Sequence, residues 1–302
     1  MSKTTAHILM LIAAFIWGTT FVAQTTGMDT IGPFAFNTAR YLIGAIALLP
    51  LALIERRKID LKAHLQTDRR LCYQTFGLGV MMFGGIALQQ TALLYTQVAN
   101  AAFLTALYVP AVPIFLFIFL RQPIAARIWL ALILSLGGAW LLSGTTDLLS
   151  QWGDFLVATG ALFWAGHIIL IGLVMTKLKT PFQFAFVQNV LCVLFGLVPT
   201  ILIESPYLSD FLPVLPELFY AGLFSVGIAY TLQMIAQGYA STTLAAFILS
   251  LESVFAAISG WLLLNQNLSW LAITGCTLIF VAIIIADVLP AHWFGREREK
   301  PK

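Results

Sequence analysis

Charged residues are scarce in this sequence. Lys, Arg, Asp and Glu make up 10% of its 302 residues, whereas hydrophobic residues make up 60%. Soluble domains carry roughly 25% charged residues, so this chain lacks the charge that a water-exposed surface needs. The composition argues against a soluble enzyme, a disordered chain and a nucleic-acid-binding protein, because each requires more polar or charged residues. We therefore expect an integral membrane protein.

Cysteine and histidine are also few. The three cysteines, Cys72, Cys192 and Cys276, lie in or beside apolar segments and show no CxxC spacing, so they indicate neither a metal nor a redox centre. His167 has no second His, Cys or carboxylate three or four residues away, a spacing that a helical metal site would use. We expect no metal and no cofactor.

Long hydrophobic runs dominate what is present. A bilayer-spanning helix needs about 20 apolar residues, and the chain contains ten apolar segments of about that length, five in each half. The remaining connections are too short for an extramembrane domain, so we predict an all-α integral membrane protein with ten transmembrane helices. The predicted spans are residues 6–26, 33–54, 72–95, 100–120, 126–144, 153–175, 181–203, 215–238, 243–264 and 269–289.

Basic residues fall in alternate connections. With the exception of Arg40, every Lys and Arg lies near a chain end or in residues 55–70, 121–127 or 177–179. The intervening connections carry acidic residues instead. Because short loops rich in Lys and Arg stay on the cytoplasmic side of a membrane, this sorting predicts a multi-pass protein with both termini in the cytoplasm.

The two halves of the sequence resemble each other. Residues 101–107 read AAFLTAL and residues 245–251 read AAFILSL, while Trp17 and Trp164 each stand near a glycine in the first apolar segment of their half. Since each half contains an odd number of spans, the second half is inserted upside down relative to the first. We therefore predict two inverted five-helix repeats, residues 1–148 and 149–302, that can pack in two similar ways around a central site.

This pattern resembles the EamA-type permeases of the drug/metabolite transporter superfamily over essentially the whole chain. The resemblance rests on the two five-helix repeats, Trp17 with Gly18 on the first helix, Arg40 on the second and the paired fourth and ninth helices. It implies a bacterial inner-membrane carrier that moves amino acids or other small metabolites, often outward, by alternating access without ATP. It further implies a small-molecule substrate, surrounding membrane lipid and no nucleic-acid partner, in a monomer or a homodimer.

The chain departs from the family pattern on the fourth and ninth helices. Where the family commonly has Leu-Glu-Pro, this chain has Glu252 followed by Ser253, and where the family commonly ends these helices with Glu, it has Gln122 and Gln266. The first departure removes a proline that would kink the ninth helix. Pro110 and Pro113 remain on the fourth helix, where they interrupt backbone hydrogen bonding and mark a possible hinge.

Three ionisable residues, Arg40, His167 and Glu252, lie deep inside predicted spans and away from the span ends, where a charge costs at least about 2.5 kcal/mol. Glu252 is interpreted either as a proton carrier or ligand for a substrate amine, or as the partner of Arg40 in a structural ion pair. Arg40 either holds a substrate carboxylate or caps helix carbonyl groups. His167 either faces the substrate or is a neutral packed imidazole.

Aromatic and amide residues within the spans complete the predicted lining of a substrate site. Their alternative role is packing between helices. The predicted substrate-binding residues are Trp17, Gln89, Gln90, Tyr108, Trp164, His167, Tyr230, Gln233 and Glu252.

Two other function classes compete with a carrier. An intramembrane enzyme needs a nucleophile with its base or a pair of intramembrane acids, and the sequence offers only Glu252 in mid-span. A receptor or scaffold needs a soluble module for its output, and the connections leave no room for one. A carrier of small metabolites, not an enzyme, is the function that the sequence favours.

Overall fold

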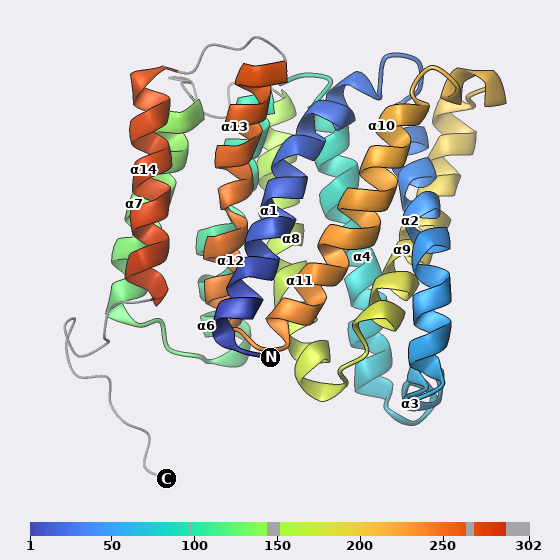
Figure 1. The fold of residues 1–302 in the computed structure, drawn as a ribbon, viewed down its shortest axis with the longest axis horizontal. Helices are drawn as coiled ribbons and strands as arrows, with labels where there is room; N and C mark the ends of the chain where they lie inside the picture. The colour runs from blue at the N-terminus through green and yellow to red at the C-terminus, as the bar shows by residue number, and fades with distance from the viewer. Residues whose placement is uncertain (97, 144–151, 264–268, 288–302) are drawn as a thin grey trace.

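A computed structural model describes residues 1–96, 98–143, 152–263 and 269–287. In these residues every regular element is a helix (Figure 1). The first half contains α1 (Lys3–Thr26), α2 (Pro33–Arg56), α3 (Leu61–Thr67), α4 (Arg69–Ala92), α5 (Val98–Thr105), α6 (Tyr108–Leu120) and α7 (Ala126–Ser143). The second half contains α8 (Trp152–Lys177), α9 (Pro181–Pro199), η1 (Thr200–Glu204), η2 (Leu208–Phe211), α10 (Leu215–Phe219), η3 (Tyr220–Ala229), α11 (Tyr230–Gln237), α12 (Thr242–Leu249), α13 (Leu251–Leu263) and α14 (Trp270–Asp287).

Nine helical stretches in the described part of the chain are long and apolar enough to cross a membrane. A further apolar helix, Ala126–Leu141, is shorter. These stretches match the predicted spans to within a few residues. The connection predicted as a loop over residues 55–70 differs, because it contains α3, whose first turn is capped by the Asp60 carboxylate accepting from the Lys62 backbone N–H at 3.0 Å. The predicted boundary between the halves at residues 148 and 149 and the charged tail after residue 287 lie outside the described residues.

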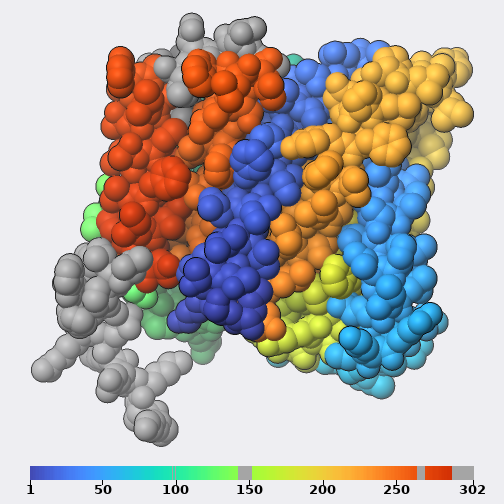
Figure 2. Space-filling model, in the orientation of Figure 1, coloured from blue at the N-terminus to red at the C-terminus, as the bar shows by residue number. Residues whose placement is uncertain are grey.

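The helices pack in pairs drawn from both halves. α7 packs on α14 at one end of the molecule and α2 packs on α9 at the other, while α4 packs on α8 and α1 packs on α13 between them (Figure 1). In Figure 2 the N-terminal helix, coloured blue, lies between orange helices of the second half. The core therefore forms between the halves and not within each one.

A close approach between α1 and α13 depends on Gly18. A Cβ atom at this position would lie 2.8 Å from the Glu252 carbonyl oxygen and 2.4 Å from the Phe255 Cβ atom. Because neither atom can move away freely, only glycine lets the two backbones meet at this depth.

The ends of α2 and α9 cap each other reciprocally. Glu204, which follows α9, accepts hydrogen bonds from the backbone N–H groups of Phe34 at 2.9 Å and Ala35 at 2.7 Å, at the start of α2. Glu55, near the end of α2, accepts from the backbone N–H of Gln183 at 2.9 Å, at the start of α9. Each carboxylate satisfies N–H groups that have no partner within their own helix.

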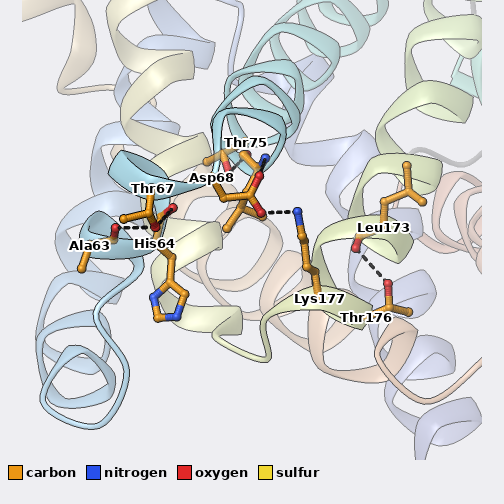
Figure 3. A network of polar contacts seen from close by, with 9 residues as sticks. Ala63, His64, Thr67, Asp68, Thr75, Leu173, Thr176 and Lys177 are labelled. Atoms are coloured by element: carbon orange, nitrogen blue, oxygen red, sulfur yellow. Dashed lines mark hydrogen bonds and ion pairs between the residues drawn. The ribbon is translucent and has the colours of Figure 1, made fainter.

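The basic connections share one edge of the molecule. The start of α1, the segment around α3, the α6–α7 connection and the α8–α9 connection all lie at the lower edge in Figure 1. On this edge Lys177 pairs with Asp68, at the beginning of α4 (Figure 3). Nδ1 of His7 lies 3.4 Å from a carboxylate oxygen of Asp287, so the start of α1 and the end of α14 are neighbours. Among the described Lys and Arg residues, Arg40 is the one that lies away from this edge.

Two helices are broken in mid-span. α5 ends at Thr105 and α6 begins at Tyr108, while α12 ends at Leu249 and α13 begins at Leu251. The second break forms without the proline of the family pattern, as the Ser250 hydroxyl donates to the Phe247 carbonyl oxygen at 2.7 Å and the Ser253 N–H bonds to the Ser250 carbonyl oxygen at 3.1 Å. Residues 220–229 add a stretch of π-helix, η3, which widens the helix that precedes Tyr230.

Candidate functional site

A cavity of about 40 Å³ lies among the central helices of both halves. By the same measure a water molecule needs about 10–15 Å³, so the cavity in this conformation holds only a few waters. Arg40 and eight of the nine predicted substrate-binding residues line it. These eight are Trp17, Gln89, Tyr108, Trp164, His167, Tyr230, Gln233 and Glu252.

Gln90 is the predicted residue that the cavity does not include. Its side chain is fully buried and donates through Nε2 to the backbone oxygen of Gln24 at 2.9 Å. Gln90 thus joins α4 to α1, whereas its neighbour Gln89 donates to the Thr105 hydroxyl at 2.8 Å and borders the cavity. The sequence could not separate these two amides, because helix rotation decides which one faces inward.

Aromatic rings gather around Tyr230. Its ring centroid lies 4.7 Å from that of Trp17, 6.3 Å from that of Trp164 and 6.0 Å from that of His167. The Trp17 indole donates to the Ser225 carbonyl oxygen at 3.4 Å, in the π-helical stretch before Tyr230. The two tryptophans therefore approach the same tyrosine from opposite halves of the chain.

Two buried ionisable groups, one basic and one acidic, also reach the cavity. Arg40 on α2 is 3% exposed and Glu252 on α13 is 7% exposed. The three ion pairs found within 4.0 Å among the described residues do not include them, so the structural Arg40–Glu252 ion pair, one of the two alternatives, is not formed in this structure. Arg40 instead places its guanidinium carbon 5.6 Å from the ring centre of Phe36 and 5.4 Å from that of Tyr41. Glu252 lines the cavity together with Tyr108.

Several buried polar atoms beside the cavity have no hydrogen-bond partner among the residues that the structure describes. They include the indole nitrogen of Trp164, Nδ1 of His167, Nε of Arg40 and Oε1 of Gln233. The other ring nitrogen of His167, Nε2, lies 3.0 Å from Oε1 of Gln188. Buried polar atoms are normally satisfied, so this group of donors and acceptors is suited to water or to a polar ligand.

The two helix breaks place equivalent residues at the cavity. The sequence offset that aligns Ala101 with Ala245 also places Thr105 over Leu249 and Tyr108 over Glu252. All four of these residues line the cavity, from the ends of α5 and α12 and the starts of α6 and α13. Thr105 and Leu249 were missed as site residues, although the repeat alignment already contained the signal. Gln188 was missed as the partner of His167, and its signal was an amide within a predicted span.

Metal chemistry has no evident site in the part of the chain that the structure describes. No group of three His, Cys, Asp or Glu residues there is arranged to hold a metal ion. Cys192 is buried, and Cys72 and Cys276 lie on other helices.

Comparisons with known proteins agree with this architecture. An uncharacterized transporter of Archaeoglobus fulgidus is 29% identical over 283 residues, covering 94% of this chain and 86% of that protein. The uncharacterized transporter YwfM of Bacillus subtilis is 27% identical over 295 residues, covering 94% of each chain. A solved crystal structure at 17% identity covers 95% of this chain and 98% of the other with a TM-score of 0.72, which shows the fold alone. The model of the EamA-like transporter family matches residues 4–144 and again 151–286. The chain therefore belongs to the EamA-like transporter family and is a multi-pass membrane transporter.

Proposed function

We propose that this transporter carries small zwitterionic metabolites such as amino acids by alternating access, without ATP, around the central cavity. The observation that carries the proposal is the separation of Arg40 and Glu252, which line one cavity without pairing. A guanidinium is suited to bind a carboxylate through two parallel hydrogen bonds, and a carboxylate is suited to bind an ammonium group. An α-amino acid presents both groups on one carbon, and the aromatic rings around Tyr230 offer contact for its side chain.

Packing between the halves supports two inverted repeats and two alternative conformations. The pairing of α4 with α8 has a counterpart in the pairing of η3 and α11 with α1, and the pairing of α1 with α13 has a counterpart in that of α8 with α6. The two caps are related in the same inverted way, because Glu55 near the end of α2 caps the start of α9 and Glu204 after α9 caps the start of α2, at the opposite edge. We infer that α7 also spans the membrane, which raises the nine spans to ten, and that the halves, residues 1–148 and 149–302, open the cavity to either side in turn.

We also infer the orientation and direction. With the basic edge in the cytoplasm, both termini are cytoplasmic. The resemblance to the EamA-type permeases adds a bacterial inner membrane and outward transport. The cavity of about 40 Å³ is smaller than an amino acid needs, so this conformation must widen before a substrate enters. Such a narrow state is the kind that a carrier passes through between its two open forms.

Ligand chemistry provides the direct test. Purified protein is screened by thermal shift against the twenty amino acids, and the best ligand is compared with its amide, which lacks the carboxylate, and its N-acetyl derivative, which lacks the ammonium group. We expect both derivatives to bind about tenfold or more weakly, because each leaves one buried charge without its partner. Arg40→Gln should weaken the binding of the parent amino acid but should not change the binding of the amide, which has no carboxylate for Arg40 to hold. Equal affinity for all three compounds would contradict the zwitterion assignment.

Transport assays test whether the cavity is the substrate site. Trp164→Ala should lower counterflow of the best ligand in proteoliposomes at least tenfold, because it removes the cavity wall beside Tyr230. Trp270→Ala is the matched control, since Trp270 is 84% exposed at the start of α14. Equal transport by both variants, at equal insertion and folding, would assign Trp164 to packing.

A further inference from the structure

A second hollow of about 470 Å³ lies on the outer face of the helix bundle, and only apolar residues line it. α8 packs against both α4 and α6, so α8 forms the floor and the other two helices form the walls. We call this hollow the α8 groove. Gly166 lies on this floor and has no side chain to fill the groove. A Cβ atom at this position would lie 2.8 Å from the sulfur of Met81.

The α8 groove opens toward the bilayer. Leu162 on its floor is 49% exposed and Phe119 on its wall is 73% exposed, and both belong to apolar spans. An apolar hollow of this kind does not hold ordered water, since water there would find no hydrogen-bond partner. Hydrocarbon chains of membrane lipid are therefore the material that can fill it.

The groove has the length of one membrane leaflet. It follows α8 from Leu162 to Leu173, a distance of about 16 Å at 1.5 Å per residue. The hydrocarbon core of a bilayer is about 30 Å thick, so the groove crosses about half of it. On the α6 wall it ends at Leu120, at the basic edge of the molecule. The groove thus spans the leaflet on that side.

The guanidinium group of Arg121 lies at this end of the groove. Arg121 directly follows Leu120, is exposed, and ends α6 with a left-handed backbone at φ 53°. Among the described residues, Arg121 is in none of the ion pairs within 4.0 Å. Lys177, one turn beyond Leu173, is already held by Asp68 (Figure 3). A guanidinium in this position is suited to bind a lipid phosphate.

We propose that the α8 groove binds one acyl chain of an acidic phospholipid from the leaflet at the basic edge, with Arg121 holding its phosphate. The apolar lining, the one-leaflet length and the cation at the mouth each fit this ligand. The site is separate from the central cavity and independent of what the carrier moves.

Photocrosslinking of the full-length protein tests the proposal. The probe is phosphatidylglycerol with a diazirine in its acyl chain, added to the protein in phosphatidylcholine vesicles, and crosslinked peptides are mapped after digestion. We expect labels to concentrate on residues 115–120 of α6 and 162–173 of α8. The same diazirine chain on phosphatidylcholine should label these residues about fivefold less, because its net charge is zero.

Two variants and a control complete the design. Arg121→Gln should lower labelling by phosphatidylglycerol about fivefold, whereas Arg57→Gln, which removes an exposed charge from the same edge, should leave it unchanged. Gly166→Leu should block the floor and displace the label, and its melting temperature shows whether the variant is folded. Labels spread evenly over all lipid-facing helices, equal labelling by both lipids, or equal effects of the two arginine variants would each overturn the proposal.

Discussion

Arg40 and Glu252 reach the same cavity from α2 and α13, yet no ion pair joins them. A structural ion pair would neutralise both groups and would make the removal of either one costly. Separate charges instead leave each group available to a ligand. None of the ion pairs within 4.0 Å among the described residues includes Glu252, so no cation in contact fixes its protonation.

Glu252→Gln tests whether this carboxyl group couples transport to protons. The variant should still exchange substrate across proteoliposomes but lose the acceleration caused by an imposed pH gradient, because glutamine cannot titrate. As Arg40 is not bound to Glu252, the changes in melting temperature of Glu252→Gln and Arg40→Gln should add in the double variant. A strong non-additive change would indicate a hidden ion pair, and an undiminished pH response would contradict proton coupling through Glu252.

Asp68 offers a contrasting case at the basic edge. The hydrogen bond from Lys177 is the main cause that lowers the pKa of Asp68 below its ordinary value of 3.8. A lowered carboxyl pKa contributes stability that is present above pH 3.8 and is lost as the pH falls through the lowered value. Asp68→Asn should therefore reduce the melting temperature by the same small amount at pH 6 and pH 8, and the difference from the unchanged protein should shrink as the pH falls below 3.8. The amide oxygen keeps the cap on the Leu71 N–H, so a difference that varies between pH 6 and 8 would point to another group.

At the scale of elements, the breaks in the fourth and ninth spans and the reciprocal caps of α2 and α9 fix the geometry of the site. The breaks bring Tyr108 and Glu252 to the first turns of α6 and α13, beside the cavity. The break before α13 needs no proline, because Ser250 and Ser253 supply local hydrogen bonds, and the Ser253 hydroxyl also donates to the Ala102 carbonyl oxygen at 3.1 Å. Small polar side chains thus replace a residue that the family pattern uses for the same purpose.

The cap on α2 can be tested by Glu204→Ala. This change leaves the N–H groups of Phe34 and Ala35 without their acceptor and should destabilise the protein by about 0.5–2 kcal/mol, the usual range for losing a helix cap. Asp29→Ala is the control, since Asp29 is an exposed acid on the same edge. Equal melting temperatures for the two variants would mean that water replaces the carboxylate without cost.

At the scale of the whole molecule, the basic edge and the opposite edge, which carries the acidic residues Asp29 and Glu204, predict an orientation in the membrane. In a variant without the three native cysteines, Asp29→Cys should react with an impermeant thiol reagent added outside intact cells. Lys62→Cys should react only after the membrane is opened, because both positions are exposed but lie at opposite edges. Reaction at position 62 in intact cells would reverse the proposed orientation.

Sequence alone determined that this is a helical membrane protein, where its spans fall, how its basic residues sort and which family it resembles, because these properties depend on composition and on positions along the chain. Tertiary structure decided which side chains meet. It separated Gln89 from Gln90, left Arg40 and Glu252 unpaired, and paired His167 with Gln188. These outcomes depend on the rotation of each helix about its axis and on contacts between helices from different halves. Hydropathy is nearly uniform around such spans, so the sequence pattern does not encode that rotation.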